Sequence, residues 1–227
     1  MDIVALKVNE GELDRRLTWS ECLLRALDKI EGDIVLYMQE DYFIKAPVGN
    51  EMVEKYVQLM CDDKSIDCIH LTDQAVINEG KSKYNGLFKV KLKQRYRVGC
   101  QAALWRKNVL KSYLREHESA WQFEEFGSMR STRINHHFYV VDPNVVQLGK
   151  YEIIPYVFTG IVQGRWKEDV VTLFSNHGIE IDFSKRGFLN DAPRRSLALK
   201  FNGFVKRLPG RFASYIDLYL RKLDKQK

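Results

Sequence analysis

The chain has 227 residues, of which 45% are hydrophobic and 29% are charged, and a formal net charge of +6. This composition is ordinary for a soluble globular protein, and the length suits one α/β domain with or without a small appendage. No apolar run approaches the length of a membrane span, and Met1 is not followed by the basic and apolar segments of a signal peptide, so we expect neither feature. The four cysteines lack zinc-ligand spacing, which indicates reduced thiols in a cytoplasmic protein.

The positive charge is concentrated toward the C-terminus. Residues 185–227 contain 12 Lys and Arg against 3 Asp and Glu, a balance of +9, whereas residues 1–184 have a balance of −3. A basic segment of this kind can bind an anionic membrane surface, nucleic acid or an acidic partner, or can simply increase solubility. We therefore divide the chain into a main domain, residues 1–190, and a basic amphipathic helical tail, residues 191–227.

The first forty residues predict a strand, a helix and a second strand. Residues 3–8 form a short apolar strand, and residues 18–21 fit a capping box in which Thr18 and Glu21 bind each other's backbone N–H groups. Apolar residues at helical spacing follow, up to Gly32. Residues 34–38 are a continuous apolar run, which favours a strand buried on both faces of a parallel sheet.

This run ends directly at Gln39-Glu40-Asp41. Two adjacent carboxylates just beyond the carboxyl end of a buried strand lie where open α/β sheets bind their ligands. Oxygen ligands suit a hard divalent cation such as Mg²⁺ or Mn²⁺, which in turn holds a diphosphate. A polar turn without a ligand is the alternative, and it is the commoner case for an isolated acidic pair.

The remaining elements are predicted from the same periodicities. Residues 78–86 are polar and contain two glycines, which indicates a surface loop, and the strand after them carries lysines on its outer face. His136 and His137 fall within a predicted strand, so their rings point to opposite faces and only one can enter a given metal site. A structural role is the commoner one for such a histidine. Helices are predicted at 52–60, 105–115 and 168–176, and strands at 66–71, 87–98, 134–141 and 178–183.

The segment from Glu118 to Ser128 interleaves three aromatic residues with three carboxylates. Aromatic faces stack on sugar rings, carboxylates accept hydrogen bonds from sugar hydroxyls, and one carboxylate can act as a general base. The alternative is a core helix in which the aromatic residues are buried and the glutamates are solvated. The residues concerned are Trp121, Phe123 and Phe126, and Glu118, Glu124 and Glu125.

Two further stretches carry open alternatives. Residues 156–166 contain Gly160 and Gly164 before Arg165, which fits a phosphate-binding loop and equally a turn with a buried tryptophan.

The tail contains two amphipathic helical segments separated at Pro209-Gly210. The second segment can lie on an anionic membrane surface, or can pack on the protein or on a second copy of the chain, and packing on the protein is the commonest fate. Its apolar stripe comprises Phe212, Tyr215, Ile216, Tyr219 and Leu223.

Five segments carry a family resemblance. They are W-S-E-C-L-L-R-A-L-D-K-I (19–30), D-I-V-L-Y-M-Q-E-D-Y-F-I (33–44), A-L-W-R (103–106), E-S-A-W-Q-F-E (118–124) and R-G-F (186–188). Together they resemble bacterial glycosyltransferases of the GT-A type, related to the family 2 group, which occur in gene clusters for capsule, exopolysaccharide and lipopolysaccharide synthesis. The resemblance implies an α/β fold with a GT-A-like mixed, mainly parallel sheet flanked by helices. It also implies a nucleotide-diphosphate sugar as donor and a glycan or lipid-linked acceptor.

The resemblance also implies roles for individual residues. GT-A enzymes hold the donor through a divalent metal, Mn²⁺ or Mg²⁺, bound by a D-x-D-like motif after a buried strand, and Gln39-Glu40-Asp41 occupies that place. Asp41 is the expected metal ligand and Glu40 its neighbour or second ligand, with His137 as a further candidate. Glu40 and Arg165 are the candidates for contact with the nucleotide diphosphate.

The expected general base comes from the aromatic and acidic segment. Inverting members of the family have an acidic dipeptide at the start of a helix that faces the acceptor, and Glu124-Glu125 resembles it. Glu124 is the first candidate, Glu125 the second and Glu118 the third. Because an exposed carboxylate is a weak base, burial against Trp121 and Phe123 has to raise the pKa of Glu124.

The acidic motif stands close to the start of the sequence. Since GT-A domains place more than one strand before it, we expect the first βα unit to be missing and the sheet to have an exposed edge. The alternative function is therefore a non-catalytic domain that binds a glycan, a membrane or a partner protein. The expected location is the cytoplasm, with peripheral attachment to the inner face of the cytoplasmic membrane through the tail, and a homodimer is a further expectation. Nucleic acid is not an expected partner, because the tail contains no recognition motif.

Overall fold

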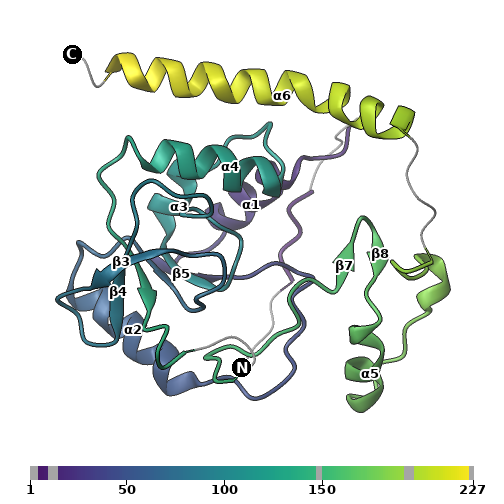
Figure 1. Ribbon diagram of the computed structural model, residues 1–227, viewed down its shortest axis with the longest axis horizontal. Coiled ribbons are helices and arrows are strands. Elements are labelled where there is room, and N and C mark those ends of the chain that lie inside the picture. Colours follow the sequence, from purple (N-terminus) through teal and green to yellow (C-terminus); the bar gives the residue numbers. More distant parts are fainter. Residues whose placement is uncertain (1–4, 10–14, 147–149, 192–196, 225–227) are drawn as a thin grey trace.

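The structure, a computed structural model, describes residues 5–9, 15–146, 150–191 and 197–224. A mixed six-stranded sheet is flanked by helices, a smaller unit lies beside it, and a long C-terminal helix crosses one side (Figure 1). The expected α/β class is therefore confirmed.

The sheet has the strand order β1-β5-β2-β6-β4-β3. Only β2 and β6 pair in parallel, and the other four pairs are antiparallel, so the expectation of a mainly parallel sheet is wrong. Strands β1, β2 and β6 nevertheless point the same way, because β5 runs antiparallel between β1 and β2. The bounds in sheet order are Ile34–Tyr37, Ala103–Arg106, Cys68–His70, Phe138–Val141, Leu87–Val90 and Asn78–Lys81.

Strand β1 lies at the edge of the described sheet and not in its centre. Val35 is buried in the core, but Leu36 is 43% exposed. The expected exposed sheet edge is therefore present, whereas the expected burial of this strand on both faces is wrong. A continuous apolar run records that a strand is hydrophobic and says nothing of how many neighbours it has.

Four helices flank the sheet: α1 (Trp19–Asp28), α2 (Asn50–Asp62), α3 (Lys107–Tyr113) and α4 (Ala120–Ser131). The predicted capping box of α1 is confirmed, since Thr18 Oγ1 accepts from Glu21 N–H at 3.1 Å and Glu21 Oε2 accepts from Thr18 N–H at 2.8 Å. Helix α4 starts in the same way, with Ser119 and Gln122 as the two capping residues. Helices α1, α3 and α4 pack together on one side of the sheet, and α2 lies on the other (Figure 1).

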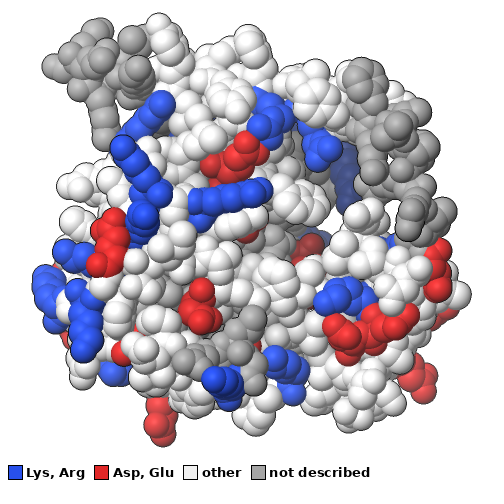
Figure 2. All heavy atoms as spheres, in the orientation of Figure 1, with Lys and Arg blue, Asp and Glu red and all other residues white. Residues whose placement is uncertain are grey.

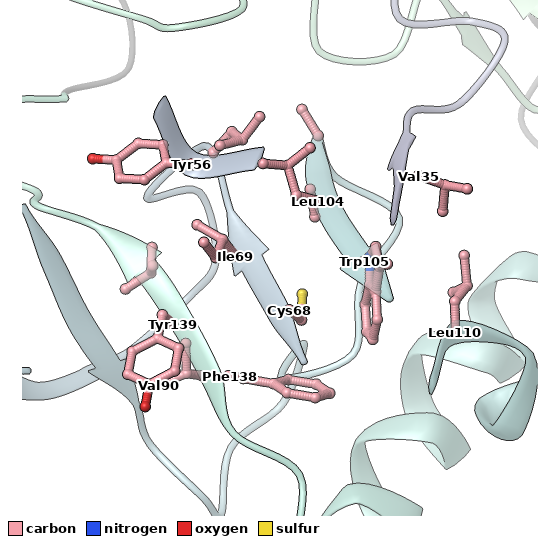
Figure 3. Packing of buried hydrophobic residues seen from close by; sticks show 14 of the residues in the cluster. Val35, Tyr56, Cys68, Ile69, Val90, Leu104, Trp105, Leu110, Phe138 and Tyr139 are labelled. Carbon is pink, nitrogen blue, oxygen red and sulfur yellow. The ribbon is translucent and has the colours of Figure 1, made fainter. Parts of the chain in front are cut away.

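The main core is centred on β5, the strand between β1 and β2. Trp105 is fully buried and makes an edge-to-face contact with Phe138 of β6 at a centroid distance of 5.1 Å (Figure 3). Tyr113 of α3 packs edge-to-face on the same Phe138 ring at 5.8 Å. These rings join α3 to two strands, and truncation of such large buried aromatic residues typically costs about 3–5 kcal/mol.

Several predicted elements are shorter or different in the structure. Residues 5–9, the described part of the first predicted strand, have no regular structure, and the predicted loop at 78–86 contains β3. The predicted helix at 105–115 begins as strand β5, because Trp105 is held by pairing on both sides. His136 and His137 precede β6, and residues 178–183 form no strand but lead into a short 3₁₀ helix, Phe183–Lys185.

A smaller unit follows the sheet. It contains the hairpin β7 (Ile161–Val162) and β8 (Arg165–Trp166) and the helix α5 (Asp169–Asn176). Gln163 and Gly164 both have positive φ, 55° and 80°, as a tight two-residue hairpin turn requires. Its core is formed by Trp166, Val170 and Phe174. The alternative prediction of a turn with a buried tryptophan is thus confirmed.

The tail forms one continuous helix, α6 (Leu197–Asp224), and not two segments. Pro209 lies inside it and removes one backbone hydrogen bond without ending the helix. The turn that follows is held against α4, because a Cβ at Gly210 would lie only 3.2 Å from Gln122 Nε2. Within the described residues, no helix combines the length and the hydrophobicity needed to cross a bilayer.

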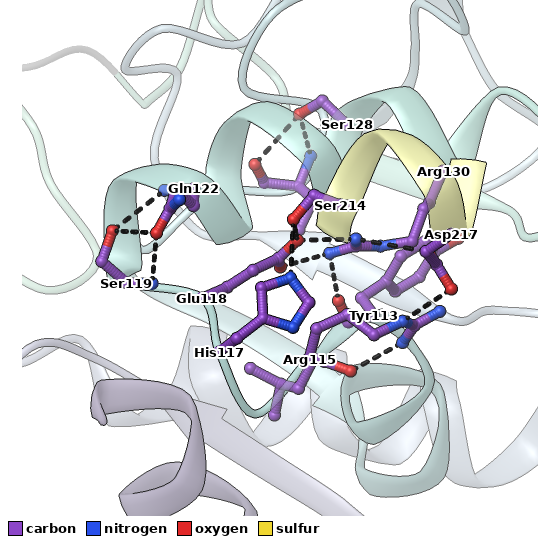
Figure 4. A network of polar contacts seen from close by, with 12 residues as sticks. Tyr113, Arg115, His117, Glu118, Ser119, Gln122, Ser128, Arg130, Ser214 and Asp217 are labelled. Atoms are coloured by element: carbon purple, nitrogen blue, oxygen red, sulfur yellow. Dashed lines mark hydrogen bonds and ion pairs between the residues drawn. The ribbon is translucent and has the colours of Figure 1, made fainter. Parts of the chain in front are cut away.

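A buried polar network fixes α6 on α4 (Figure 4). Arg130 and Glu118 are both fully buried, and the two Arg130 Nη atoms donate to Glu118 Oε1 at 2.8 Å and Oε2 at 2.5 Å. Ser214 of α6 donates to Glu118 at 2.7 Å and contacts His117 Nε2 at 2.9 Å. Glu118 is therefore a structural residue with its hydrogen bonds satisfied, which leaves it unsuited to act as a base.

The network gives the first prediction. Glu118→Ala removes the bidentate partner of the buried Arg130 guanidinium and leaves it only the longer ion pair with Asp217, at 3.6 Å, so we expect the free energy of unfolding to fall by about 3–5 kcal/mol. Urea denaturation followed by circular dichroism measures this change. The matched control is Asp28→Ala, which removes a surface pair with Lys111 and should cost about 1 kcal/mol or less. Equal losses for the two variants would contradict the assigned structural role of Glu118.

Candidate functional site

The acidic turn Gln39-Glu40-Asp41 lies just beyond the carboxyl end of β1, as predicted. Asp41 Oδ2 accepts from the Thr159 hydroxyl at 2.6 Å, and the Asp41 carbonyl accepts from Gly160 N–H at 2.7 Å. The first bond orients the carboxylate, and both tie the turn to the segment that precedes β7. Glu40 is exposed to solvent.

An aromatic wall stands beside this turn. The rings of Tyr42 and Tyr156 stack at a centroid distance of 4.9 Å, and Phe158 also stacks on Tyr42, at 6.1 Å. The amide of Gln101 joins the two hydroxyls, because it donates to Tyr42 Oη at 2.8 Å and accepts from Tyr156 Oη at 2.8 Å. Burial raises the pKa of Tyr42 well above its usual range and that of Tyr156 to about 12, so both remain neutral.

Glu124, the first candidate for the general base, is partly buried on α4. Burial raises the pKa of its carboxyl, and the hydrogen bond from Cys100 N–H, at 3.0 Å, opposes this shift. The direction is the one a general base requires. The expected contribution of Trp121 is wrong, since that ring is 78% exposed, whereas Phe123 is fully buried and packs on Trp19.

Glu124 and the acidic turn both lie near Cys100. This cysteine precedes β5, at the end of the sheet where β1 finishes. Burial raises the pKa of the Cys100 thiol above its usual range, and the Glu124 and Glu40 carboxylates raise it further. Gln39 and Tyr37 hydrogen-bond to the same thiol. The structure therefore brings together the two predicted carboxylate groups, which lie more than eighty positions apart in the sequence.

Glu125, the second candidate, has the opposite environment. The Arg211 guanidinium of α6 donates two hydrogen bonds to its carboxylate, at 2.6 and 2.7 Å. This pairing lowers the pKa of Glu125 and makes it a poorer base than Glu124. Glu125 is thus an anchor for α6, and Glu124 remains the stronger candidate.

His137 does not join the acidic turn. It is exposed and lies immediately before the first residue of β6, where its backbone N–H donates to Asp67 Oδ2 at 2.7 Å. His137 precedes β6, whereas Asp41 follows β1. Because β1 and β6 run in the same direction, the two residues lie at opposite ends of the strands. The expectation that His137 shares a metal with Asp41 is therefore wrong.

Arg165 lies on β8, in the smaller unit. This hairpin is attached to the acidic turn through Gly160, which donates to the Asp41 carbonyl at 2.7 Å and accepts from Lys167 N–H at 2.9 Å. The Arg165 guanidinium passes close to Gly187, where a Cβ would lie 3.0 Å from Nη1. The next residue along β8, Trp166, has the Arg186 guanidinium 6.0 Å from its ring centroid. Arg186 was not predicted as a site residue, although the R-G-F segment contained it.

The side chains available as metal ligands suit a hard cation only in part. Among the described residues, no group of three or more His, Cys, Asp and Glu side chains could hold a metal ion. Asp41 and Glu40 remain as two carboxylates on one turn. This matches the way Mg²⁺ is commonly held, through one or two carboxylates together with substrate phosphates and water.

Comparisons with known proteins find no match to this chain among protein-family models, curated protein sequences or solved structures. The family resemblance accordingly rests on the sequence segments themselves.

The neighbouring glutamates give the second prediction. Since the pKa of Glu124 is raised in the folded state, its contribution to stability is full below its unfolded pKa of about 4.5 and is lost as pH rises through the folded pKa. Glu124→Gln keeps an acceptor for Cys100 N–H and removes the charge. We therefore expect the variant to be more stable than the wild type at pH 7, with a difference that shrinks toward pH 4.

Glu125→Gln is the matched control with the opposite sign. Its lowered pKa contributes stability above about pH 4.5 that is lost as pH falls through the folded value, so this variant should be less stable than the wild type at pH 7. Urea denaturation at both pH values measures the two differences. Destabilisation by both substitutions at pH 7 would contradict the assigned environment of Glu124.

Proposed function

We propose that this protein is a glycosyltransferase that moves a sugar from a nucleotide-diphosphate sugar to a glycan or lipid-linked acceptor in the synthesis of a bacterial surface polysaccharide. The observation that carries the proposal is the position of Glu124. A carboxylate with a raised pKa and a pair of acidic residues at the end of a strand both lie near Cys100. This arrangement offers a base for one substrate and, for the other, a position for the divalent cation that would hold its diphosphate.

In the proposed reaction, Glu124 accepts the proton of an acceptor hydroxyl as that oxygen attacks the anomeric carbon of the donor. Attack from the face opposite the diphosphate inverts the configuration at that carbon. Asp41 and Glu40 would hold the divalent cation, which supplies charge neutralisation on the leaving diphosphate. Arg165 and Arg186 are the proposed cationic contacts for the phosphates.

Trp121 provides the proposed platform for the acceptor. It lies three residues before Glu124 on α4, so both side chains project from the same face of the helix. An indole ring that is 78% exposed has an apolar face free to stack on a sugar ring. The aromatic wall of Tyr42, Tyr156 and Phe158 would bound the donor side and exclude water there.

The third prediction tests the donor site. We expect UDP, GDP or CDP, added with Mn²⁺, to raise the thermal midpoint of the protein above its value with Mn²⁺ alone. A ligand that binds only the folded state adds about 2.7 kcal/mol at a hundredfold excess over its Kd. Asp41→Asn should abolish the shift and keep the fold, since an amide oxygen can still accept from Thr159.

The control for that substitution is Asp62→Asn, on the exposed end of α2, which should leave the nucleotide shift unchanged. Isothermal titration with the nucleotide that gives the shift then measures its affinity for each variant. A shift retained by Asp41→Asn would contradict the placement of the donor site at the acidic turn.

The alternative function is a non-catalytic domain that binds a glycan, a membrane or a partner protein. The exposure of Trp121 favours its glycan-binding form, because a stacking platform needs no donor site. The two functions differ in one readout, since a binding domain shows no response to any nucleotide. A folded sample without a nucleotide shift, and with glycan binding that Trp121→Ala removes, would favour this alternative.

A further inference from the structure

Helix α6 carries most of its described apolar residues on the side that faces away from the protein. Ser214 and Leu218, four residues apart, are buried against α4. Phe212 is 68% exposed and Tyr219 is 62% exposed, and both lie on the opposite side of the helix. The exposed stripe comprises Phe204, Val205, Leu208, Phe212, Tyr215, Ile216, Tyr219 and Leu220. Of the predicted stripe, Phe212, Ile216 and Tyr219 face solvent, whereas Tyr215 is half-exposed and packs edge-to-face on Phe126 of α4 at a centroid distance of 5.0 Å. Leu223 lies outside the residues whose side chains the structure describes.

The cations of α6 and its neighbours lie beside this apolar stripe. Lys206 and Arg207 are exposed on α6, and Arg211 is half-buried next to α4. In Figure 2 the outer side of α6, along the top of the view, is mainly white. Lys and Arg, in blue, gather on the side of α6 toward the rest of the protein. An apolar face bordered by cations is the pattern of a helix that lies in the interface of an anionic bilayer.

A hollow next to α6 adds a place for a phosphate group. Its volume is about 500 Å³, and it opens between the end of α4 and the apolar stripe. Lys93 and Arg133 supply two cations, and Tyr215 and Tyr219 line the same hollow. The Arg133 guanidinium also donates to the Leu218 carbonyl, which holds it at the edge of α6.

We propose that α6 binds the surface of an anionic phospholipid bilayer, with the apolar stripe among the acyl chains and lipid phosphates at Lys93 and Arg133. Charge distinguishes this partner from a second copy of the chain. Residues 185–227 have a balance of +9, so pairing two stripes would bring two strongly cationic segments together. An anionic surface attracts the same charge, and tyrosine is suited to the interface because its ring is apolar and its hydroxyl polar.

The proposal is independent of the transfer reaction and has a consequence for it. Helix α4, which carries Trp121 and Glu124, is fixed to α6 by the buried network around Glu118. A bilayer bound by α6 would therefore hold the candidate site at a constant distance from the membrane surface, where a lipid-linked acceptor would be found.

The test is co-sedimentation of the full chain with vesicles of phosphatidylcholine alone or mixed with phosphatidylglycerol. We expect binding to the mixed vesicles and about tenfold weaker binding, or none, to phosphatidylcholine alone. Phe212→Ser combined with Tyr219→Ser should reduce binding to the mixed vesicles by about tenfold or more, without changing the thermal midpoint, because both side chains are exposed. Lys93→Glu should weaken binding to the mixed vesicles in the same direction.

The matched control is Ile77→Ser combined with Val145→Ser. Each of these side chains is 56% exposed, and both lie outside α6. This variant should bind the mixed vesicles like the wild type. The proposal is overturned if the wild type does not bind the mixed vesicles, or if the α6 substitutions leave binding unchanged. A dimer in sedimentation velocity that Phe212→Ser with Tyr219→Ser converts to a monomer would also overturn it, and would assign the stripe to a second copy.

Discussion

The buried ion pair between Glu118 and Arg130 determines how the helical side of this protein is assembled. Both side chains are fully buried, and removing either one would leave the other charge without its bidentate partner in a medium where it is poorly solvated. Glu118 precedes the first turn of α4 and Arg130 belongs to its last turn, so the pair restrains both ends of that helix. Ser214 of α6 donates a hydrogen bond to Glu118, which favours the observed register of α6 on α4.

This constraint accounts for the different properties of Glu124 and Glu125. Consecutive residues of a helix point about 100° apart, so once the rotation of α4 is fixed the two carboxylates must enter different surroundings. Glu124 faces the sheet edge, where its partner is the N–H of Cys100. Glu125 faces α6, where Arg211 binds it through both oxygens. Burial raises one pKa and a cation lowers the other, which separates a candidate base from an anchor.

Local features of the fold could be predicted from the sequence. The capping box at Thr18 was predicted because both partners lie within four residues, and the acidic turn was placed correctly because it directly follows an apolar run. Several of the failures involve distant residues. The pairing that makes β1 an edge strand depends on β5, and the ion pair that removes Glu118 from the candidate bases is completed by Ser214, 96 positions later. The expected site of His137 is wrong because the periodicity of a sequence does not show how two strands are oriented in the sheet. It therefore cannot show whether the start of β6 lies near the end of β1.

Helix α6 illustrates a further limit of periodicity. The spacing of Phe212, Tyr215, Ile216 and Tyr219 identifies an apolar stripe, but the assumption that such a stripe faces the protein depends on what the opposite side of the helix offers. Here the inner face carries Ser214 and Arg211, and each has a specific acceptor, Glu118 and Glu125, on or next to α4. Charge-assisted hydrogen bonds to these carboxylates are stronger than neutral ones. They would be lost if the helix rotated to bury Phe212 and Tyr219, so these polar contacts, together with the buried Leu218 and the contact of Tyr215 with Phe126, keep that face of α6 exposed.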